Sequence, residues 1–509
     1  MERQNEAGQG KLTGRIQEGP DTLLHDAVLT PQFQYELRHL LPFYIWIEKA
    51  LLLEYRRLGL LDAQDITEIG AVLHQISPQT LVADQALNMS DIAFAIEQFV
   101  CAHISWTGKQ RYWHVDRSRN DLQAGAQLLF ARNQLFETVE FLLAVFETAH
   151  ARAQEHVEVL MPGYTHYQAA QVISPGFYLA AFTEHLLSTL KRLLNVYHDI
   201  NASPLGAGAM AGQTLAWDRE VLAHYLGCER VQRHGLVAVA SCAWSLQLAG
   251  ELAAFCSELS RFATDFIAWG SSAYGFITLP DRLSAISSAM PQKKNFPILE
   301  RIRGKTAHVS ALYVDFLLGQ RNTAYTNLVE VSKEAGAFLQ TLFSTVQVTL
   351  QLFQLFLEHV EFRHEQMEQA CKKEFLGGFA LANYLTLQYN IPYRTAQVIA
   401  GSYIARALER RQEPLKGEPA LLEEVGREHG YTVTISRPVL VQFFDPESNL
   451  REKRSAGSAS PAAVTRLLAL QKEEIAAVRT GWRDLKMQVI QAYQRVNELL
   501  SLGEQGVIE

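Results

Sequence analysis

The most unusual polar segment of this chain is Ser287–Asn295, SSAMPQKKN, which is followed shortly by Glu300. Adjacent serines, a proline, two lysines and an asparagine can present one hydroxyl beside ammonium and amide donors. That arrangement suits a developing oxyanion. A polar surface loop is the simpler interpretation, but it does not explain why the segment leads directly into Ile298-Leu299-Glu300, a helix start that would fix it to the core.

A second candidate is His114–Asp121, HVDRSRND. It holds two guanidinium groups, a hydroxyl and an amide within four residues at the start of a long helix. Forked donors and free backbone N–H groups of this kind are suited to a carboxylate. Taken alone, the motif is explained better as a helix start with surface ion pairs.

A third candidate is Gly163–Gln168, GYTHYQ, where His166 lies between a threonine and a glutamine in a loop. Histidine ionises near neutrality and can act as a general acid or base. A single histidine is more often structural, so this motif is weak by itself.

Long amphipathic helices must position these motifs. Apolar residues recur at helical spacing from Leu128 to Phe146 and from Leu179 to Tyr197, and Val331–Phe362 follows a similar pattern. The uncharged stretch Gly235–Gly250 is shorter than a bilayer crossing. We expect a helix there that is enclosed by other helices of this chain or of neighbouring subunits.

Breaks in the helical pattern predict domain borders near residues 112 and 366, and hence domains at 1–112, 113–366 and 367–509. After Pro461 an a/d heptad pattern continues toward the C-terminus. We expect this helix to pack on its own domain, and a seam between subunits is the alternative. Strand-like alternation is convincing only around Tyr431, Val433 and Ile435.

Composition restricts the function classes. The 509 residues carry 46 basic and 54 acidic side chains, a net charge of −8, which gives no sign of a nucleic-acid-binding face. Five cysteines form no C-x-x-C pair, so we expect reduced core residues and neither disulfides nor a zinc site. The segment Met1–Asp21 lacks the apolar run of a secretory signal, which predicts a cytoplasmic protein. The sequence gives no reason to expect a metal or a cofactor.

The motifs together resemble argininosuccinate lyases of the fumarase/aspartase superfamily. The resemblance spans roughly residues 85 to 470 in the same order, and is carried by HVDRSRND, MPGYTHYQAAQ, SPLGAGAMAGQTLAWDRE, SSAMPQKKNFPILERIRGK, EFLGGFALANYL, IPYRTAQVIAG and DPESNLREKRSAGSASPAAV. It implies a mainly α, three-domain fold whose central long helices form a twenty-helix core in a homotetramer. Each active site would then combine three subunits, with no nucleic acid or membrane partner.

The resemblance also implies residue roles in releasing fumarate from a succinyl unit. Ser287 would take the carbon-bound proton, and Lys293 with Asn295 would bind the carboxylate that becomes the aci-carboxylate. His166, paired with Glu300, would protonate the departing nitrogen or relay a proton, directly or through water. The residues implied in binding substrate are Ser118, Arg119, Asn120, Thr165, Asp91, Tyr325, Glu330 and Lys333.

The chain departs from the family where an amino-acid leaving group would be recognised. The family's D-I-x-G-S-x-A-H pattern is replaced at Tyr44–Leu51, and its E-D-x-H block keeps Asp91 but has lost the histidine. A glutamine of the Y-x4-Q-x2-K pattern is replaced by Glu330, and the S-D-R-D block is replaced at Ala240–Ala243. The fumarate-forming residues remain.

Three functions therefore compete. The favoured one is β-elimination by a carbon–nitrogen lyase acting on argininosuccinate or another N-substituted aspartate. The second is a lyase of specialised metabolism that acts on a different aspartate adduct. The third is a catalytically inactive structural or regulatory homologue, against which the intact set Ser287, Lys293, Asn295, His166 and Glu300 counts.

Overall fold

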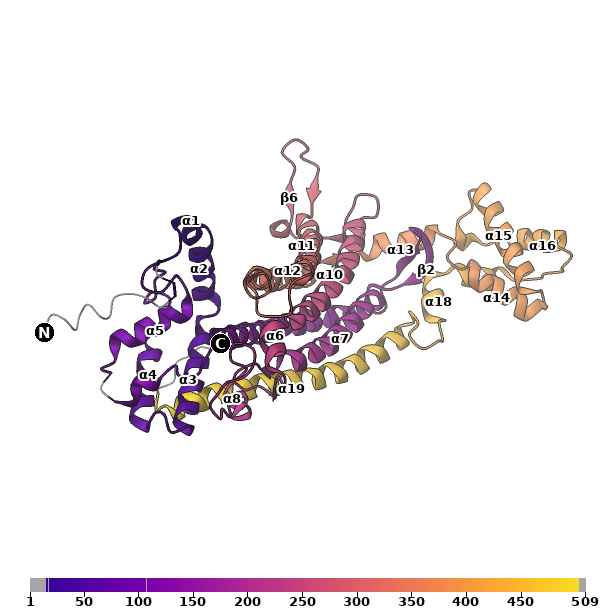
Figure 1. Cartoon of the computed structure of the whole chain (residues 1–509). Coiled ribbons are helices and arrows are strands. Elements are labelled where there is room, and N and C mark those ends of the chain that lie inside the picture. Colours follow the sequence, from indigo (N-terminus) through magenta and orange to yellow (C-terminus); the bar gives the residue numbers. More distant parts are fainter. Residues whose placement is uncertain (1–14, 17, 107, 503–509) are drawn as a thin grey trace.

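Long helices dominate the computed structural model, which describes residues 15–16, 18–106 and 108–502 (Figure 1). Five of them pack side by side as a central bundle in which α10 contacts α7 and α11, while α6 contacts α7 and α12. Their bounds are Arg119–Glu155 for α6, Pro175–Ile200 for α7, Ala243–Trp269 for α10, Pro297–Gln320 for α11 and Leu339–His359 for α12. The mainly helical architecture predicted from the sequence is confirmed.

The periodic stretches of the sequence lie inside these helices. Ser118 caps α6 by accepting a hydrogen bond from the Asn120 N–H, and most apolar residues between Leu128 and Phe146 are buried. A serine at this position satisfies one of the free N–H groups at the helix start. The prediction for 331–362 was only partly right, because a π-helical turn at Glu330–Glu334 and a 3₁₀ turn precede α12.

Shorter helices flank the bundle at both ends. The N-terminal group consists of α1 (Thr22–Leu24), α2 (Thr30–His39), α3 (Leu41–Arg57), α4 (Ala63–His74) and α5 (Ile92–His103). The C-terminal group consists of α13 (His364–Lys373), α14 (Gly378–Tyr389), α15 (Tyr393–Glu409), α16 (Pro419–Glu428), α17 (Arg437–Phe444) and α18 (Pro446–Arg451). Two short helices, α8 (Arg219–Tyr225) and α9 (Gly235–Ala240), follow α7. Helices α14 to α17 enclose a small core of their own.

The predicted heptad helix is α19, Pro461–Leu499. Its a/d residues Ile475, Trp482 and Val489 are buried in the main core, and the helix runs along α7, α6 and α3. The prediction that it packs on its own domain is therefore wrong, because the helix packs within the chain mainly on the central bundle and the N-terminal helices (Figure 1).

The strands are short pairs. They are β1–β2 (Met161–Thr165 with Gln168–Ile173), β3–β4 (Ala202–Ser203 with Arg230–Val231), β5–β8 (Ile277–Thr278 with Glu361–Phe362) and β6–β7 (Ala285–Ile286 with Lys294–Asn295). The strand predicted around Tyr431 is wrong. Val433 and Ile435 are buried there, which explains the alternation, but the segment pairs with no strand.

Two further expectations need correction. The stretch 235–250 is two helices separated at Ser241–Cys242, and Val237 is 40% exposed in the single chain. All five cysteines are free, but only Cys256 and Cys371 are buried, whereas Cys228 and Cys242 are half-buried and Cys101 is exposed. In the part of the chain that the structure describes, no helix has the length and apolar character needed to cross a membrane.

Candidate active site

The residues singled out from the sequence lie in three separate places in one chain. Ser287, Lys293 and Asn295 belong to the β6–β7 hairpin above α11, and Thr165 and His166 belong to the β1–β2 hairpin beside α13 (Figure 1). The third place is the start of α6. Among residues 18–106 and 108–502, no hydrogen bond or ion pair joins one place to another. The chain alone therefore does not assemble them.

The β6–β7 hairpin, which we call the arm, is held by a minimal ladder. Only Ala285 pairs with Asn295 and Ile286 with Lys294, so the loop Ser287–Lys293 is longer than the strands that close it. The Lys294 ammonium bonds to Asp281 at 2.9 Å. The arm projects from the bundle in Figure 1, and Ile286 is 91% exposed.

Within the arm, the loop's own backbone is directed at the Ser287 hydroxyl. Ser287 Oγ accepts from the N–H of Met290 at 3.1 Å and from the N–H of Ala289 at 3.4 Å. Backbone donors on an oxygen favour its negatively charged form. Lys293 is exposed and makes no side-chain bond among the described residues, so its ammonium is free to bind an anion.

His166 occupies a strained turn. Thr165 pairs with Gln168, which leaves His166 and Tyr167 as a two-residue loop with φ of 54° and 59°. Turns of type I′ require positive φ at both positions and favour Asn-Gly. Two residues with large side chains cost on the order of 1 kcal/mol each there, so the turn sacrifices stability to present them. Glu300, in the first turn of α11, is exposed and does not contact His166 in the same chain.

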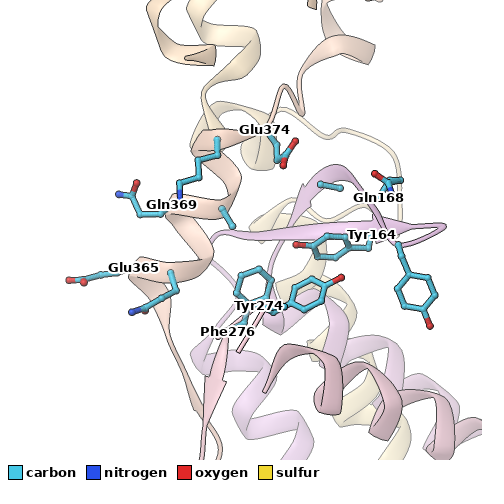
Figure 2. A pocket seen from close by; sticks show the side chains of 13 residues that line it. Tyr164, Gln168, Tyr274, Phe276, Glu365, Gln369 and Glu374 are labelled. Carbon is cyan, nitrogen blue, oxygen red and sulfur yellow. The ribbon is translucent and has the colours of Figure 1, made fainter. Parts of the chain in front are cut away.

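The β1–β2 hairpin separates two hollows. Thr165 and His166 line one of about 690 Å³, together with Trp269 and Phe379. Figure 2 shows the other, of about 550 Å³, where the ring of Tyr164 meets that of Tyr274 at 5.3 Å. Its opposite wall is α13, with Glu365 and Gln369, and Glu374 directly after the helix. Burial, with the nearby Tyr274, raises the pKa of Tyr164 well above its ordinary value.

The start of α6 carries the third group. Arg119 donates to Asp91 at 2.9 Å and lies over the ring of Phe94 at 4.5 Å. Asp91 in turn caps α5 by accepting from the N–H groups of Ala93 and Phe94. The guanidinium is held from one side and half exposed on the other, which leaves its remaining donors available to a carboxylate.

Lys333 lies beside the first turns of α6. Its ammonium bonds to the buried Glu36 on α2, and the Ser332 carbonyl accepts from Gln123 and Gln127. Burial raises the pKa of Glu36 above its ordinary value, although Lys333 opposes the shift. Tyr325 and Glu330 are exposed on the segment before this contact.

Sequence reasoning missed Glu36. The sequence pattern that could have revealed it is a carboxylate at helical spacing with Phe33 and Leu37, on the buried face of α2.

The helix that lacks the expected D-I-x-G-S pattern, α3, packs against the segment His114–Asp121 and bonds to it. Glu48 on α3 is fully buried and bonds to Arg117 and, at 3.3 Å, to His114. Burial acts to raise the pKa of Glu48, but Arg117 and His114 outweigh it and lower the value to about 2. Across residues 15–16, 18–106 and 108–502, no group of three or more His, Cys, Asp or Glu side chains could hold a metal ion.

Comparisons with known proteins place the chain among lyases. Residues 79–311 match the model of a family described as Lyase. The chain is 28% identical to argininosuccinate lyase 1 of Shouchella clausii (strain KSM-K16) over 502 residues, covering 97% of this chain and all of that protein. It is 31% identical to argininosuccinate lyase of Alkaliphilus metalliredigens (strain QYMF), covering 74% of this chain and 80% of that one.

Solved structures show the same fold. An EDDS lyase crystallised with formate superposes with a TM-score of 0.84 at 23% identity, covering 92% of this chain and 95% of that one. The recombinant class II fumarase from Schistosoma mansoni superposes with a TM-score of 0.64 at 15% identity, over 80% of this chain and 90% of that one.

Proposed function

This chain belongs to the argininosuccinate lyase family of the fumarase/aspartase superfamily, and we propose that its substrate is argininosuccinate or a close N-substituted aspartate. It is a carbon–nitrogen lyase whose reaction is a β-elimination that releases fumarate and an amine or guanidine. One observation supports the assignment most: the arm presents Ser287, Lys293 and Asn295 together, with backbone N–H groups directed at the serine oxygen.

In the proposed reaction, each of these side chains has a separate role. Ser287 removes the proton from the carbon next to a carboxylate, and the electron pair moves into that carboxylate, which becomes the aci-carboxylate. Lys293 and Asn295 stabilise this charge as it forms. The electron pair of the aci-carboxylate then forms the carbon–carbon double bond of fumarate while the carbon–nitrogen bond breaks. The electrons of that bond leave with the nitrogen, and His166, oriented by Glu300, supplies its proton directly or through water.

Ser118, Arg119, Asn120 and Thr165 hold the succinyl carboxylates in this proposal. Asp91 contributes by fixing Arg119. Binding both carboxylates places the proton and the nitrogen on opposite sides of the carbon–carbon bond, as an anti elimination requires. Closure of the arm excludes water and strengthens these contacts.

We also propose a cytoplasmic homotetramer with a twenty-helix core, in which three subunits complete each site. The domains would be 1–112, 113–366 and 367–509. The separation of the three groups in one chain supports this, as does α11, which leaves Val314, Leu317 and Leu318 uncovered. Light scattering checks the proposal: the protein should have four times the mass of the chain, and Leu317→Arg should yield smaller, inactive species.

A second candidate is a lyase for a different aspartate adduct. The observation that favours it is the charge around Lys333. The Lys333 ammonium already bonds to the buried Glu36, and Glu330, three residues earlier, adds a further carboxylate. A leaving group that carries its own carboxylate meets fewer free cations there. Polar sites reject a substrate with a mismatched group by on the order of 10⁴ in rate.

One experiment tests both candidates. Purified protein is incubated with argininosuccinate and with a panel of N-substituted aspartates, and fumarate absorbance is followed. Ser287→Ala should lower kcat by on the order of 10³-fold, because it removes the general base. Ser288→Ala, one residue away, is the matched control and should retain activity. Fumarate released only from another adduct selects the second candidate, and no fumarate from any substrate indicates the inactive homologue.

A further inference from the structure

Two aspartates bracket the proposed carboxylate-binding residues and bond to the same loop, Ser203–Trp217, which we call the glycine loop. Asp116 precedes Ser118–Asn120 in the chain, and Asp121 follows it. We propose that Asp116 and Asp121 are positioning residues, a double clamp that fixes the glycine loop against the start of α6. The clamp thereby sets where Ser118–Asn120 meets the succinyl carboxylates.

The Asp121 half of the clamp is buried. Its side-chain Oδ2 accepts from the N–H of Gly206 at 3.0 Å and from the N–H of Gly208 at 2.9 Å, and the residue is 4% exposed. Both glycines have positive φ, and a Cβ at either would meet a neighbouring atom at 2.7 Å. The loop therefore reaches the carboxylate only because both positions are glycine.

The Asp116 half is nearer the solvent and has more bonds. Its carboxylate accepts from the backbone N–H and the hydroxyl of Thr214, from the N–H of Leu215 at 2.8 Å, and from Trp217 Nε1 at 3.1 Å. Its own carbonyl accepts from the side chain of Gln213. Asp116 thus fixes the second part of the glycine loop, residues 213–217, as Asp121 fixes the first part.

The clamp acts directly on a binding residue. Asn120 Nδ2 donates to the carbonyl of Ala209 at 2.9 Å, and Ala209 follows the two glycines that Asp121 holds. Movement of the glycine loop would therefore carry the Asn120 amide with it. Misplacement of a substrate-holding group by about 1 Å can cost on the order of 10²-fold in rate.

The two halves differ in how they respond to pH. Burial raises the pKa of Asp121 to about 7, although the N–H groups of Gly208 and Gly206 act against it. Burial also acts to raise the pKa of Asp116, but the N–H groups of Leu215 and Thr214 outweigh it and hold the pKa below its ordinary value. As the pH falls through about 7, Asp121 therefore gains a proton that the N–H groups of Gly206 and Gly208 cannot accept, while Asp116 stays ionised.

Other charges near Asp121 come from neighbouring elements. Arg219 on α8 acts on Asp121 while its guanidinium donates to the Leu205 carbonyl at 2.8 Å. Arg233 and His234 line a hollow of about 460 Å³ together with Gly206. A hydrogen bond to the glycine loop already engages Arg219, so it does not replace the two glycine N–H groups as the partner of Asp121.

Kinetics across pH test the clamp, which rests on the proposed function because its readout is fumarate release. In the wild type, KM should rise as the pH falls from 8 to 6. Asp121→Asn should raise KM on the order of ten-fold at pH 8 with a smaller change in kcat, because the new side-chain amide has an N–H that faces the loop N–H groups. The same variant should remove the dependence of KM on pH. Asp116→Asn, the matched variant, should raise KM and keep the pH dependence. Wild-type KM and pH profile in Asp121→Asn would overturn the proposal.

Hydrogen exchange tests the clamp without relying on activity or on a variant. In the wild-type protein, protection of residues 203–212, corrected for chemical exchange, should be greater at pH 8 than at pH 6, whereas residues 213–217 should change little. Equal protection of both segments at both pH values contradicts the clamp. If the wild type releases no fumarate but shows this difference, the proposed function fails while the clamp stands.

Discussion

The start of α6 and the β6–β7 arm are built in opposite ways. At the start of α6, Glu48, Asp91, Asp116 and Asp121 each bond to partners from other elements. The arm is a two-pair ladder with an exposed tip and a free Lys293. The comparison teaches that the proposed binding half is preorganised within one chain, whereas the proposed chemical half is carried on an exposed hairpin that only two residue pairs hold.

The two arm lysines offer the sharpest test of this difference. Lys293→Met should lower kcat by on the order of 10³-fold, because in the proposed reaction it removes the cation that stabilises the aci-carboxylate. Lys294→Met, its neighbour, only loses an exposed bond to Asp281 and should stay within a few-fold of the wild type. Steady-state fumarate release measures both. Equal losses in the two variants would mean that the arm acts through its general charge and not through one residue.

The buried pair beneath α6 predicts a large effect on stability. Glu48→Gln leaves Arg117 without its buried partner and should destabilise the fold by about 3 kcal/mol or more. The exposed-side partner of His114, Glu97, is the matched control, and Glu97→Gln should cost less than about 1 kcal/mol. Urea unfolding at fixed protein concentration measures the difference.

The pH dependence of that effect has a definite sign. Because the pKa of Glu48 is lowered to about 2 in the fold, its contribution is fully present above its ordinary value and is lost as the pH falls toward 2. The gap between the wild type and Glu48→Gln should therefore narrow in acid. A constant gap between pH 7 and pH 3 would show that shape, and not charge, makes Glu48 stabilising.

Much of the fold was predictable because its helices are long and amphipathic. Helices α6 and α7 were found from their period alone, and the motif residues could be named because each motif is local in sequence. The β1–β2 hairpin was missed because its turn is His-Tyr, where the usual signal is Asn-Gly. The strand at 431–435 was predicted wrongly because burial on alternate residues does not require a partner strand.

What the sequence could not supply was the partner of each charge. Glu36 lies about 300 residues from Lys333, and Asp121 meets a loop that follows the next long helix. Local spacing holds no information on such contacts, since they depend on how the helices pack. The same limit applies to α19, whose heptads show an apolar stripe but not the surface that covers it.

Replacing Arg119 tests the preorganised start of α6, and its expected effect on the kinetics is smaller than that of Lys293→Met. Arg119→Ala should raise KM by on the order of ten-fold or more, with a smaller change in kcat, because it removes a forked donor that Asp91 already holds in place. Arg111→Ala is the control, since Arg111 also lies over a ring, that of Tyr112, but outside the motif. If Arg119→Ala lowers kcat and leaves KM unchanged, the residue acts in the transition state and belongs with the arm.

Lys49 on α3 should give the smallest effect, and it differs from the paired charges at the start of α6. This buried ammonium bonds to His74 Nδ1 at 3.1 Å and to Asn497 Oδ1 at 3.0 Å, and no carboxylate bonds to it among the described residues. Burial lowers its pKa to about 8. Between about pH 8 and the ordinary pKa of lysine, the unfolded chain therefore binds more protons than the folded one. The cost of burying the charged ammonium is full below pH 8 and is relieved as the pH rises.

At pH 7, Lys49→Met should lie within about 1 kcal/mol of the wild type, because relief of the buried charge offsets the two lost bonds. At pH 9.5 the wild type should gain on the variant in urea unfolding, while the exposed Lys472→Met should show no such trend. An unchanged difference at the two pH values would mean that Lys49 keeps its proton in the fold up to pH 9.5, and that burial does not lower its pKa.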